Sequence, residues 1–142
     1  MAYENVNVSK LKGSLQKIGS IKTNKNELKK VSNELNAGNW SENSRVRIKQ
    51  AIEKTSEIYE KIEKYIENCK QAANYIEQYQ ELDRKSREYQ SKIDNNKYKI
   101  RRAQEDEDTS SYEKEVNSYN ASISNNNSRK IALKQKINDL IS

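Results

Sequence analysis

The sequence predicts an all-α fold: an elongated antiparallel helical hairpin or coiled coil with a long central helix and a third, C-terminal helix. Three observations predict it. The 142 residues include no Pro and only three Gly, so little interrupts a helix, since Pro costs about 3 kcal/mol in a helix interior. Apolar residues recur in steps of three and four, the spacing of one helix face. Lys, Glu and Asn are abundant, and all three are poor strand formers.

The first predicted helix covers residues 8–35. Gly13 and Gly19 each weaken it by about 1 kcal/mol relative to Ala, so we expect its N-terminal end to fray or to depend on a partner. It should end at residues 36–39, where Gly38 can adopt the left-handed conformation that terminates helices. Its apolar stripe consists of Val8, Leu11, Leu15, Ile18, Ile21, Leu28, Val31 and Leu35.

The second predicted helix is the longest, because neither Gly nor Pro occurs between Ser41 and Ala103. One unbroken helix of about 60 residues would be roughly 90 Å long. A bend near residues 94–96 is the alternative. Its stripe alternates steps of four and three through Ile48, Ile52, Thr55, Tyr59, Ile62, Ile66, Cys69, Ala73 and Ile76, and continues less regularly to Ile100.

The third predicted helix follows an acidic turn at residues 104–111. Ser110 and Glu113 match a capping box that opens the helix. Asn126 and Lys130 place polar groups within its apolar seam; a buried Asn there would set the register, or residues 125–128 would break the helix. The chain is thus divided into residues 1–103 and a helix in 104–142 that packs back on them.

Composition narrows the function classes. With 34% charged residues the chain is either disordered or a long amphipathic helix, and the periodicity favours the helix. The absence of His removes the usual general base and the commonest metal ligand, and the single Cys, Cys69, lies in register with the seam as a small core residue. We therefore expect a non-enzymatic protein with no cofactor, no metal, no small-molecule substrate and no membrane span, made in the cytoplasm.

The net charge of +6 does not by itself predict nucleic-acid binding. The most basic local group, Lys97, Lys99, Arg101 and Arg102, is followed at once by four acidic residues. A nucleic-acid surface requires a basic face that is not compensated in this way. We expect instead a helical protein partner, or a second copy, on the stripe through Ile52, Ile62, Ile66, Cys69 and Ile76.

One pair of short motifs distinguishes this chain from a generic coiled coil. Trp40, the only Trp, lies in Asn39-Trp40-Ser41-Glu42 between the first two predicted helices, and Tyr79-Gln80-Glu81-Leu82-Asp83 places Tyr and Asp four apart on the second. Over residues 8–84 this layout resembles the WXG family of helical-hairpin proteins handled by type VII secretion systems. The family has Gly where this chain has Glu42, and longer relatives, including small partners of LXG-type toxins, carry extra C-terminal helix.

The resemblance implies a function. Residues 1–103 would be a WXG-like hairpin, and the chain a bacterial secretion partner, chaperone or substrate that pairs with an LXG toxin leader or another small helical chain. It would be cytoplasmic, with export that needs no classical signal peptide. Trp40 of one chain and Tyr79 and Asp83 of its partner would form the export signal; Asp83 is expected to be exposed and to contribute at most about 1 kcal/mol. The alternative is a structural, self-associating coiled-coil spacer, for example of a phage or a cytoskeleton.

Overall fold

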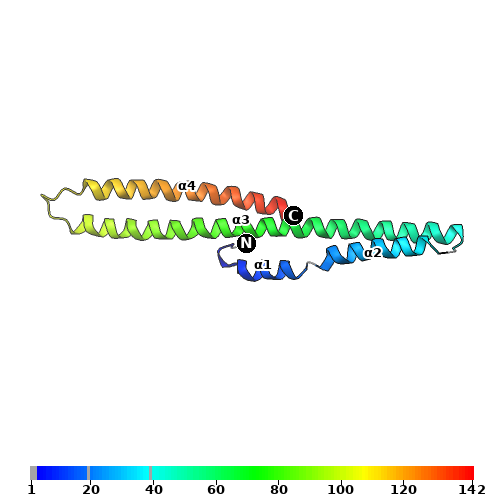
Figure 1. Cartoon of the computed structure of the whole chain (residues 1–142). Coiled ribbons are helices and arrows are strands. Elements are labelled where there is room, and N and C mark those ends of the chain that lie inside the picture. The colour runs from blue at the N-terminus through cyan, green and yellow to red at the C-terminus, as the bar shows by residue number, and fades with distance from the viewer. Residues whose placement is uncertain (1–2, 19, 39) are drawn as a thin grey trace. The chain divides into compact units, whose positions relative to one another are not determined.

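The computed structural model describes residues 3–18, 20–38 and 40–142, without the side chains of residues 20–23, 35 and 36. Within these residues every regular element is helical: η1 (Tyr3–Asn5), α1 (Val8–Lys17), α2 (Ser20–Asn36), α3 (Glu42–Arg102) and α4 (Ser110–Ile141) (Figure 1). The predicted all-α class is confirmed. No helix in the described ranges has a stretch apolar and long enough to cross a bilayer.

The first predicted helix is two helices, so the expectation of one helix over residues 8–35 is wrong. The Asn7 side chain caps α1 by accepting the Lys10 N–H at 3.0 Å, and α1 ends where the Ile18 N–H donates to the Leu15 carbonyl at 3.3 Å. Gly19, which the sequence singled out, lies outside the described residues.

The turn predicted at residues 36–41 is confirmed, but its chemistry differs from the expectation. Gly38 does not have a positive φ, so it is not a left-handed cap. It instead leaves room for Trp40: a Cβ at Gly38 would clash with the indole Nε1 and lie 2.9 Å from Cδ1. Ser41 then caps α3, because its Oγ accepts the Ser44 N–H at 3.3 Å.

The helix α3 is continuous over 61 residues, including residues 94–96, where the sequence offered a bend as the alternative. Asn96 is buried there and donates to Glu115 Oε2 of α4 at 2.8 Å. A polar side chain in the seam is therefore tolerated because it has a partner.

The helix α4 begins at Ser110, as expected, but the capping box is wrong. Thr109 precedes the helix without a side-chain cap, and Asp108 Oδ1 accepts the Ser110 N–H at 2.9 Å. This bond holds the pKa of Asp108 below its ordinary value. The Asn run at 125–127 does not break α4: Asn126 is buried and donates to Ser86 Oγ at 3.2 Å.

The chain contains two compact units. Unit 1 comprises the described residues up to Val6 together with Asn74–Leu140, and unit 2 comprises Asn7–Ala73. These bounds differ from the division into residues 1–103 and 104–142 that we expected from the sequence. That division stays a prediction.

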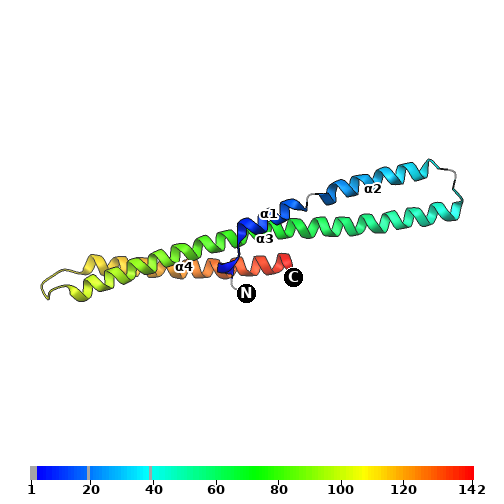
Figure 2. The ribbon, with the colours of Figure 1, turned by 90° about the horizontal axis from the view of Figure 1, so that it is seen from below.

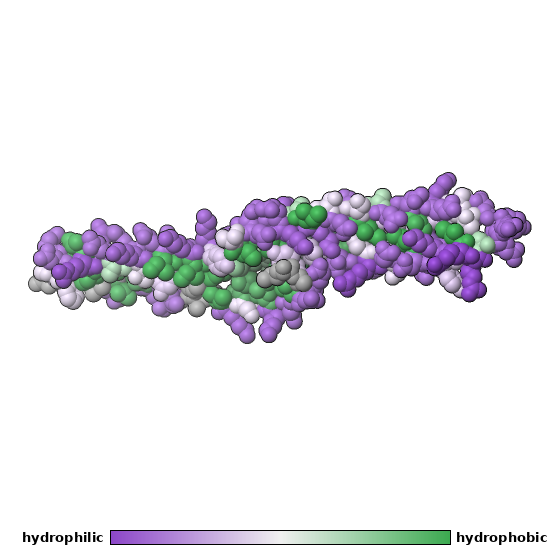
Figure 3. Space-filling model, turned by 180° about the vertical axis from the view of Figure 1, so that it is seen from behind, coloured by the Kyte–Doolittle hydropathy of each residue, from purple (hydrophilic) through white to green (hydrophobic). Residues whose placement is uncertain are grey.

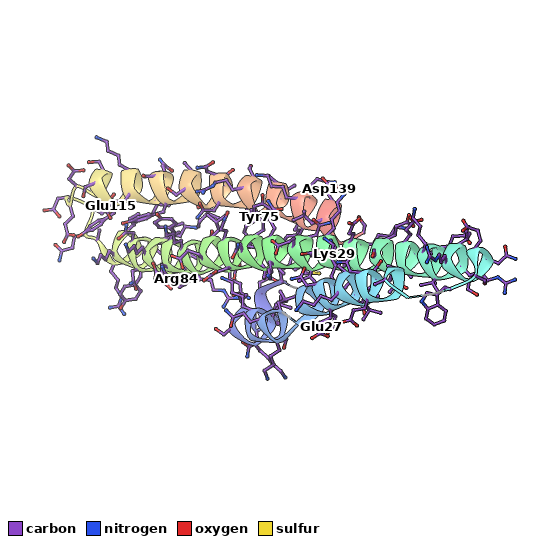
Figure 4. All side chains as sticks on the ribbon, turned by 45° about the vertical axis from the view of Figure 1, so that its right-hand side comes forward. Glu27, Lys29, Tyr75, Arg84, Glu115 and Asp139 are labelled. Atoms are coloured by element: carbon purple, nitrogen blue, oxygen red, sulfur yellow. The ribbon has the colours of Figure 1, made fainter. Side chains whose placement is uncertain are left out.

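In unit 1, α4 runs alongside the C-terminal part of α3 in both ribbon views (Figures 1 and 2). The contacts are antiparallel: residue 96 meets 115, 86 meets 126 and 83 meets 130. Tyr89 and Tyr119 stack with ring centroids 5.5 Å apart. Tyr75, labelled in Figure 4, has Lys136 Nζ 5.4 Å from its ring centroid. The apolar core consists of Tyr3, Ile76, Tyr79, Leu82, Ile93, Val116, Leu133 and Ile137.

Unit 2 joins α1 and α2 to the N-terminal part of α3. Lys25 Nζ of α2 lies 3.4 Å from Glu60 Oε1 and 3.6 Å from Glu63 Oε2 of α3, which fixes the side on which α2 packs. Among the described residues its buried apolar side chains are Leu15, Ala72 and Ala73. Two of these are Ala, so the described side chains of unit 2 bury less apolar area than those of unit 1.

Candidate functional site

Two features of the described residues stand out: a cluster of interacting polar and aromatic side chains in unit 1, and an apolar strip in unit 2. The first, which we call the Tyr79 cluster, consists of Tyr3, Glu4, Tyr79, Asp83 and Lys130. The second, the exposed strip, consists of Ile58, Ile62 and Tyr65 on α3.

Tyr79 is at the centre of its cluster and is only 2% exposed. Its hydroxyl donates to Glu4 Oε1 at 2.8 Å, and its ring meets the edge of Tyr3 with centroids 5.7 Å apart at 74°. Lys130 Nζ lies 4.7 Å from the ring centroid, within cation–π range. The side chain is thus satisfied on every side by groups of the same chain.

Asp83 belongs to an ion-pair network and does not stand alone in water. Lys130 Nζ donates to its Oδ1 at 2.8 Å, Arg87 Nη2 lies 2.9 Å from its Oδ2, and the side chain is 18% exposed. The expectation of an exposed Asp83 is therefore wrong. Partial burial lowers the pKa of Lys130, but the hydrogen bond and charge of Asp83 outweigh it, and the net shift is upward.

The segment at residues 3–6 completes the cluster. Gln80 Nε2 donates to the carbonyls of Tyr3 at 3.0 Å and Val6 at 2.7 Å, and the buried Tyr3 donates from its hydroxyl to Asn138 Oδ1 at 3.2 Å. The pKa of Glu4 is lowered, first by a backbone hydrogen bond and then by the Tyr79 hydroxyl. No periodic pattern marks this segment, so sequence reasoning missed it.

The five predicted stripe residues do not form one surface. Ile62 is exposed, Ile52, Ile66 and Cys69 are half-buried, and Ile76 is buried in the core of unit 1. Ile76 therefore contributes to the fold of unit 1 and is not available to a partner in this structure.

Of the exposed strip, the sequence predicted Ile62 as an interface residue but not Ile58 or Tyr65. Ile58, Ile62 and Tyr65 are 57%, 39% and 53% exposed, large values for apolar side chains of this size. They are spaced by four and three, so they share one face of α3. Figure 3 shows that hydrophobic residues also reach the surface among hydrophilic ones on the face it presents. The signal was a second series with helical spacing, Ile58, Ile62, Tyr65, Cys69, Ala72 and Ile76, which shares members with the predicted one.

Trp40 lies in the turn before α3 and is 46% exposed. Its indole covers Gly38, whose carbonyl accepts a hydrogen bond from Arg45 Nη2 at 3.0 Å. The Trp40 residue is therefore about half exposed in the turn, and its role in recognition stays a prediction.

Elsewhere on the described part of the chain we see no cluster of side chains arranged as a catalytic or metal-binding site. No group of three or more His, Cys, Asp or Glu side chains is placed to hold a metal ion. A groove of about 1010 Å³ in unit 1 runs over Leu82 and Leu133, with acidic and basic side chains mixed along its edges. No family model, curated protein or solved structure matches the chain.

Proposed function

We propose that this chain is a non-enzymatic helical partner or chaperone of a bacterial type VII secretion system. Unit 2 would pair with a toxin leader or another small helical protein in the cytoplasm, and the complex would be exported without a classical signal peptide. The finer architecture belongs to the same proposal: an antiparallel helical hairpin that another helical chain completes into a four-helix bundle.

The observation that carries the proposal is the exposed strip. Ile58, Ile62 and Tyr65 leave apolar area in water on one helix face, beside a core containing two Ala. Burying a large apolar side chain contributes about 1.5–3 kcal/mol, so three of them can support specific association. Anchors spaced by four and three fit the groove or face of another helix.

The motif resemblance supports a role in secretion. The contacts reduce the number of residues that are accessible as an export signal. Of the export-signal candidates Trp40, Tyr79 and Asp83, only Trp40 is exposed, whereas Tyr79 and Asp83 hold residues 3–6 and α4. We therefore assign recognition by the secretion machinery to Trp40, and to Tyr79 and Asp83 only when residues 3–6 are displaced.

The test is co-purification with a helical protein encoded beside this chain, followed by size-exclusion chromatography with light scattering. We expect a one-to-one complex that Ile62→Asp abolishes and that Lys97→Asp, an exposed change in unit 1, leaves intact. A stable homo-oligomer that excludes the neighbour would contradict the proposal and favour the self-associating spacer. Trp40→Ala should reduce export of the complex without changing its melting temperature.

A further inference from the structure

The net charge of the chain is confined to one unit. Residues 7–73 contain fourteen Lys and Arg against eight Asp and Glu, a net charge of +6. The other residues contain thirteen of each sign and are neutral. The unit that leaves its apolar face uncovered is therefore the unit that carries the whole positive charge.

Most acidic residues in this part of α3 lie away from the exposed strip. Glu60, Glu63 and Glu67 project from the opposite side of the helix, where Glu60 and Glu63 pair with Lys25 and Glu67 Oε1 lies 3.2 Å from Lys70 Nζ. Glu57 is the acidic residue nearest the strip; it is exposed and offsets part of the positive charge on that side.

Two basic residues beside the strip are available for a partner. Lys54 and Lys61 are exposed, and neither takes part in an ion pair with the described part of the chain. Lys54 precedes Ile58 by four positions and Lys61 follows it by three, so both lie next to the strip. They are seven residues apart, which places them on the same edge of α3.

We infer that the occupant of the exposed strip is an acidic amphipathic helix, with apolar residues at steps of three and four and carboxylates on its flanks facing Lys54 and Lys61. This inference rests on the proposed function and names the chemistry of the partner. A second copy fits less well, because two units of +6 repel each other. Flanking charges select partners in this way in coiled coils.

The experiment uses two synthetic helices as probes. Each is a fluorescein-labelled peptide of about four heptads with Leu at the seam positions. One carries Glu at the flanking positions and the other carries Lys there, which keeps each peptide from pairing with itself. Fluorescence anisotropy measures the binding of each to the full chain at 50 mM and 500 mM NaCl.

We expect the Glu peptide to bind at 50 mM NaCl and the Lys peptide to bind at least about tenfold more weakly, with the difference reduced at high salt. Lys54→Glu with Lys61→Glu should weaken the Glu peptide about tenfold and strengthen the Lys peptide. The matched control is Lys97→Glu with Arg101→Glu, two exposed reversals in unit 1 that should change neither. The salt comparison needs no variant, so misfolding of a variant cannot mask the result.

Equal binding of the two peptides, or no effect of the Lys54 and Lys61 reversals, would overturn the inference. If Ile62→Asp still abolished binding of the peptides or of the native partner, the proposed function would stand without an acidic partner. If Ile62→Asp left the Glu peptide bound as tightly as before and duplex DNA displaced it, the surface would be a general polyanion site. Both the inference and the apolar docking site would then fail.

Discussion

Tyr79 connects three parts of unit 1 through one side chain. Its hydroxyl binds Glu4 near the start of the chain, its face meets Lys130 of α4, and its edge meets Tyr3. The hydroxyl and the ring can therefore be tested separately, because Phe keeps the ring and removes only the hydrogen bond.

Tyr79→Phe should lower the free energy of unfolding by about 1 kcal/mol, the net value of one hydrogen bond. Tyr79→Ala should lower it by about 3–5 kcal/mol, because it also leaves a cavity beneath Tyr3. Urea denaturation of the full chain measures both. Equal losses for the two variants would show that the ring contacts contribute nothing.

Asp83 is expected to contribute more to stability than an exposed carboxylate. Asp83→Asn leaves Lys130 partly buried with a weaker partner and should cost about 1–3 kcal/mol. Asp94→Asn, on the same helix but exposed, is the control and should change little. A double-mutant cycle with Lys130→Met measures the coupling; zero coupling energy would contradict the network.

Docking of residues 3–6 should depend on pH through Glu4. Its pKa is lowered in the folded chain, so the charged form is favoured there and its contribution is complete above the ordinary value of 4.5. The contribution is lost as pH falls through the lowered value. We expect the Gln80 side-chain amide resonances in NMR spectra to move toward their undocked positions in that acidic range. In Glu4→Gln the transition should be absent, and a transition that persisted would have another origin.

At the scale of elements, α3 has two overlapping apolar series. One contains the half-buried Ile52 and Ile66, and the other, in unit 2, is exposed to solvent at Ile58 and Tyr65. Periodicity predicted the existence and length of α3 well, because every step of three or four supports a helix. It could not tell which series is covered, because that depends on where α2 lies, and only contacts such as Lys25 with Glu60 fix this.

The ends of the helices were less predictable than their interiors. Asp108 replaces the expected capping box, and Gly38 serves close approach by Trp40 instead of a left-handed turn. The cap at Asp108 and the packing of Trp40 on Gly38 both depend on which of several neighbouring polar or small residues lies nearest to the helix end. The sequence pattern does not specify this. The position of the N-terminal segment was not predictable, because Tyr3 forms its hydrogen bond with Asn138, 135 residues away in the sequence. Local sequence patterns carry no information about such a contact.

Gly38→Ala should displace the Trp40 indole, since an added Cβ would occupy its place. Trp40 is the only Trp, so its fluorescence reports the change directly as a shifted emission maximum. Gly13→Ala is the control: nothing lies within 4 Å of an added Cβ, and a helix-interior Ala should stabilise α1 by about 0.5–1 kcal/mol. Unchanged emission in Gly38→Ala would mean that the indole does not pack on the turn.

At the scale of the whole molecule, the two units should differ in stability. Unit 1 buries Ile, Leu and Tyr side chains, whereas the buried apolar residues described in unit 2 are Leu15 and two Ala. Amide hydrogen exchange should therefore be faster along α2 and the N-terminal part of α3 than along α4. Protection of α2 should rise when a partner binds. Uniform exchange over both units would contradict this expected difference in stability.

The hydrogen bond between Tyr3 and Asn138 can form only late in synthesis of this part of the chain. A ribosome adds Asn138 135 residues after Tyr3, so the hydrogen bond between them cannot form until that stretch has been made, and Tyr79 is added about midway through it. Contacts of such separation form late in folding. A nascent chain stalled before Asn138 should still hold Tyr3 accessible to protease, and a chain extended past Asn138 should protect it.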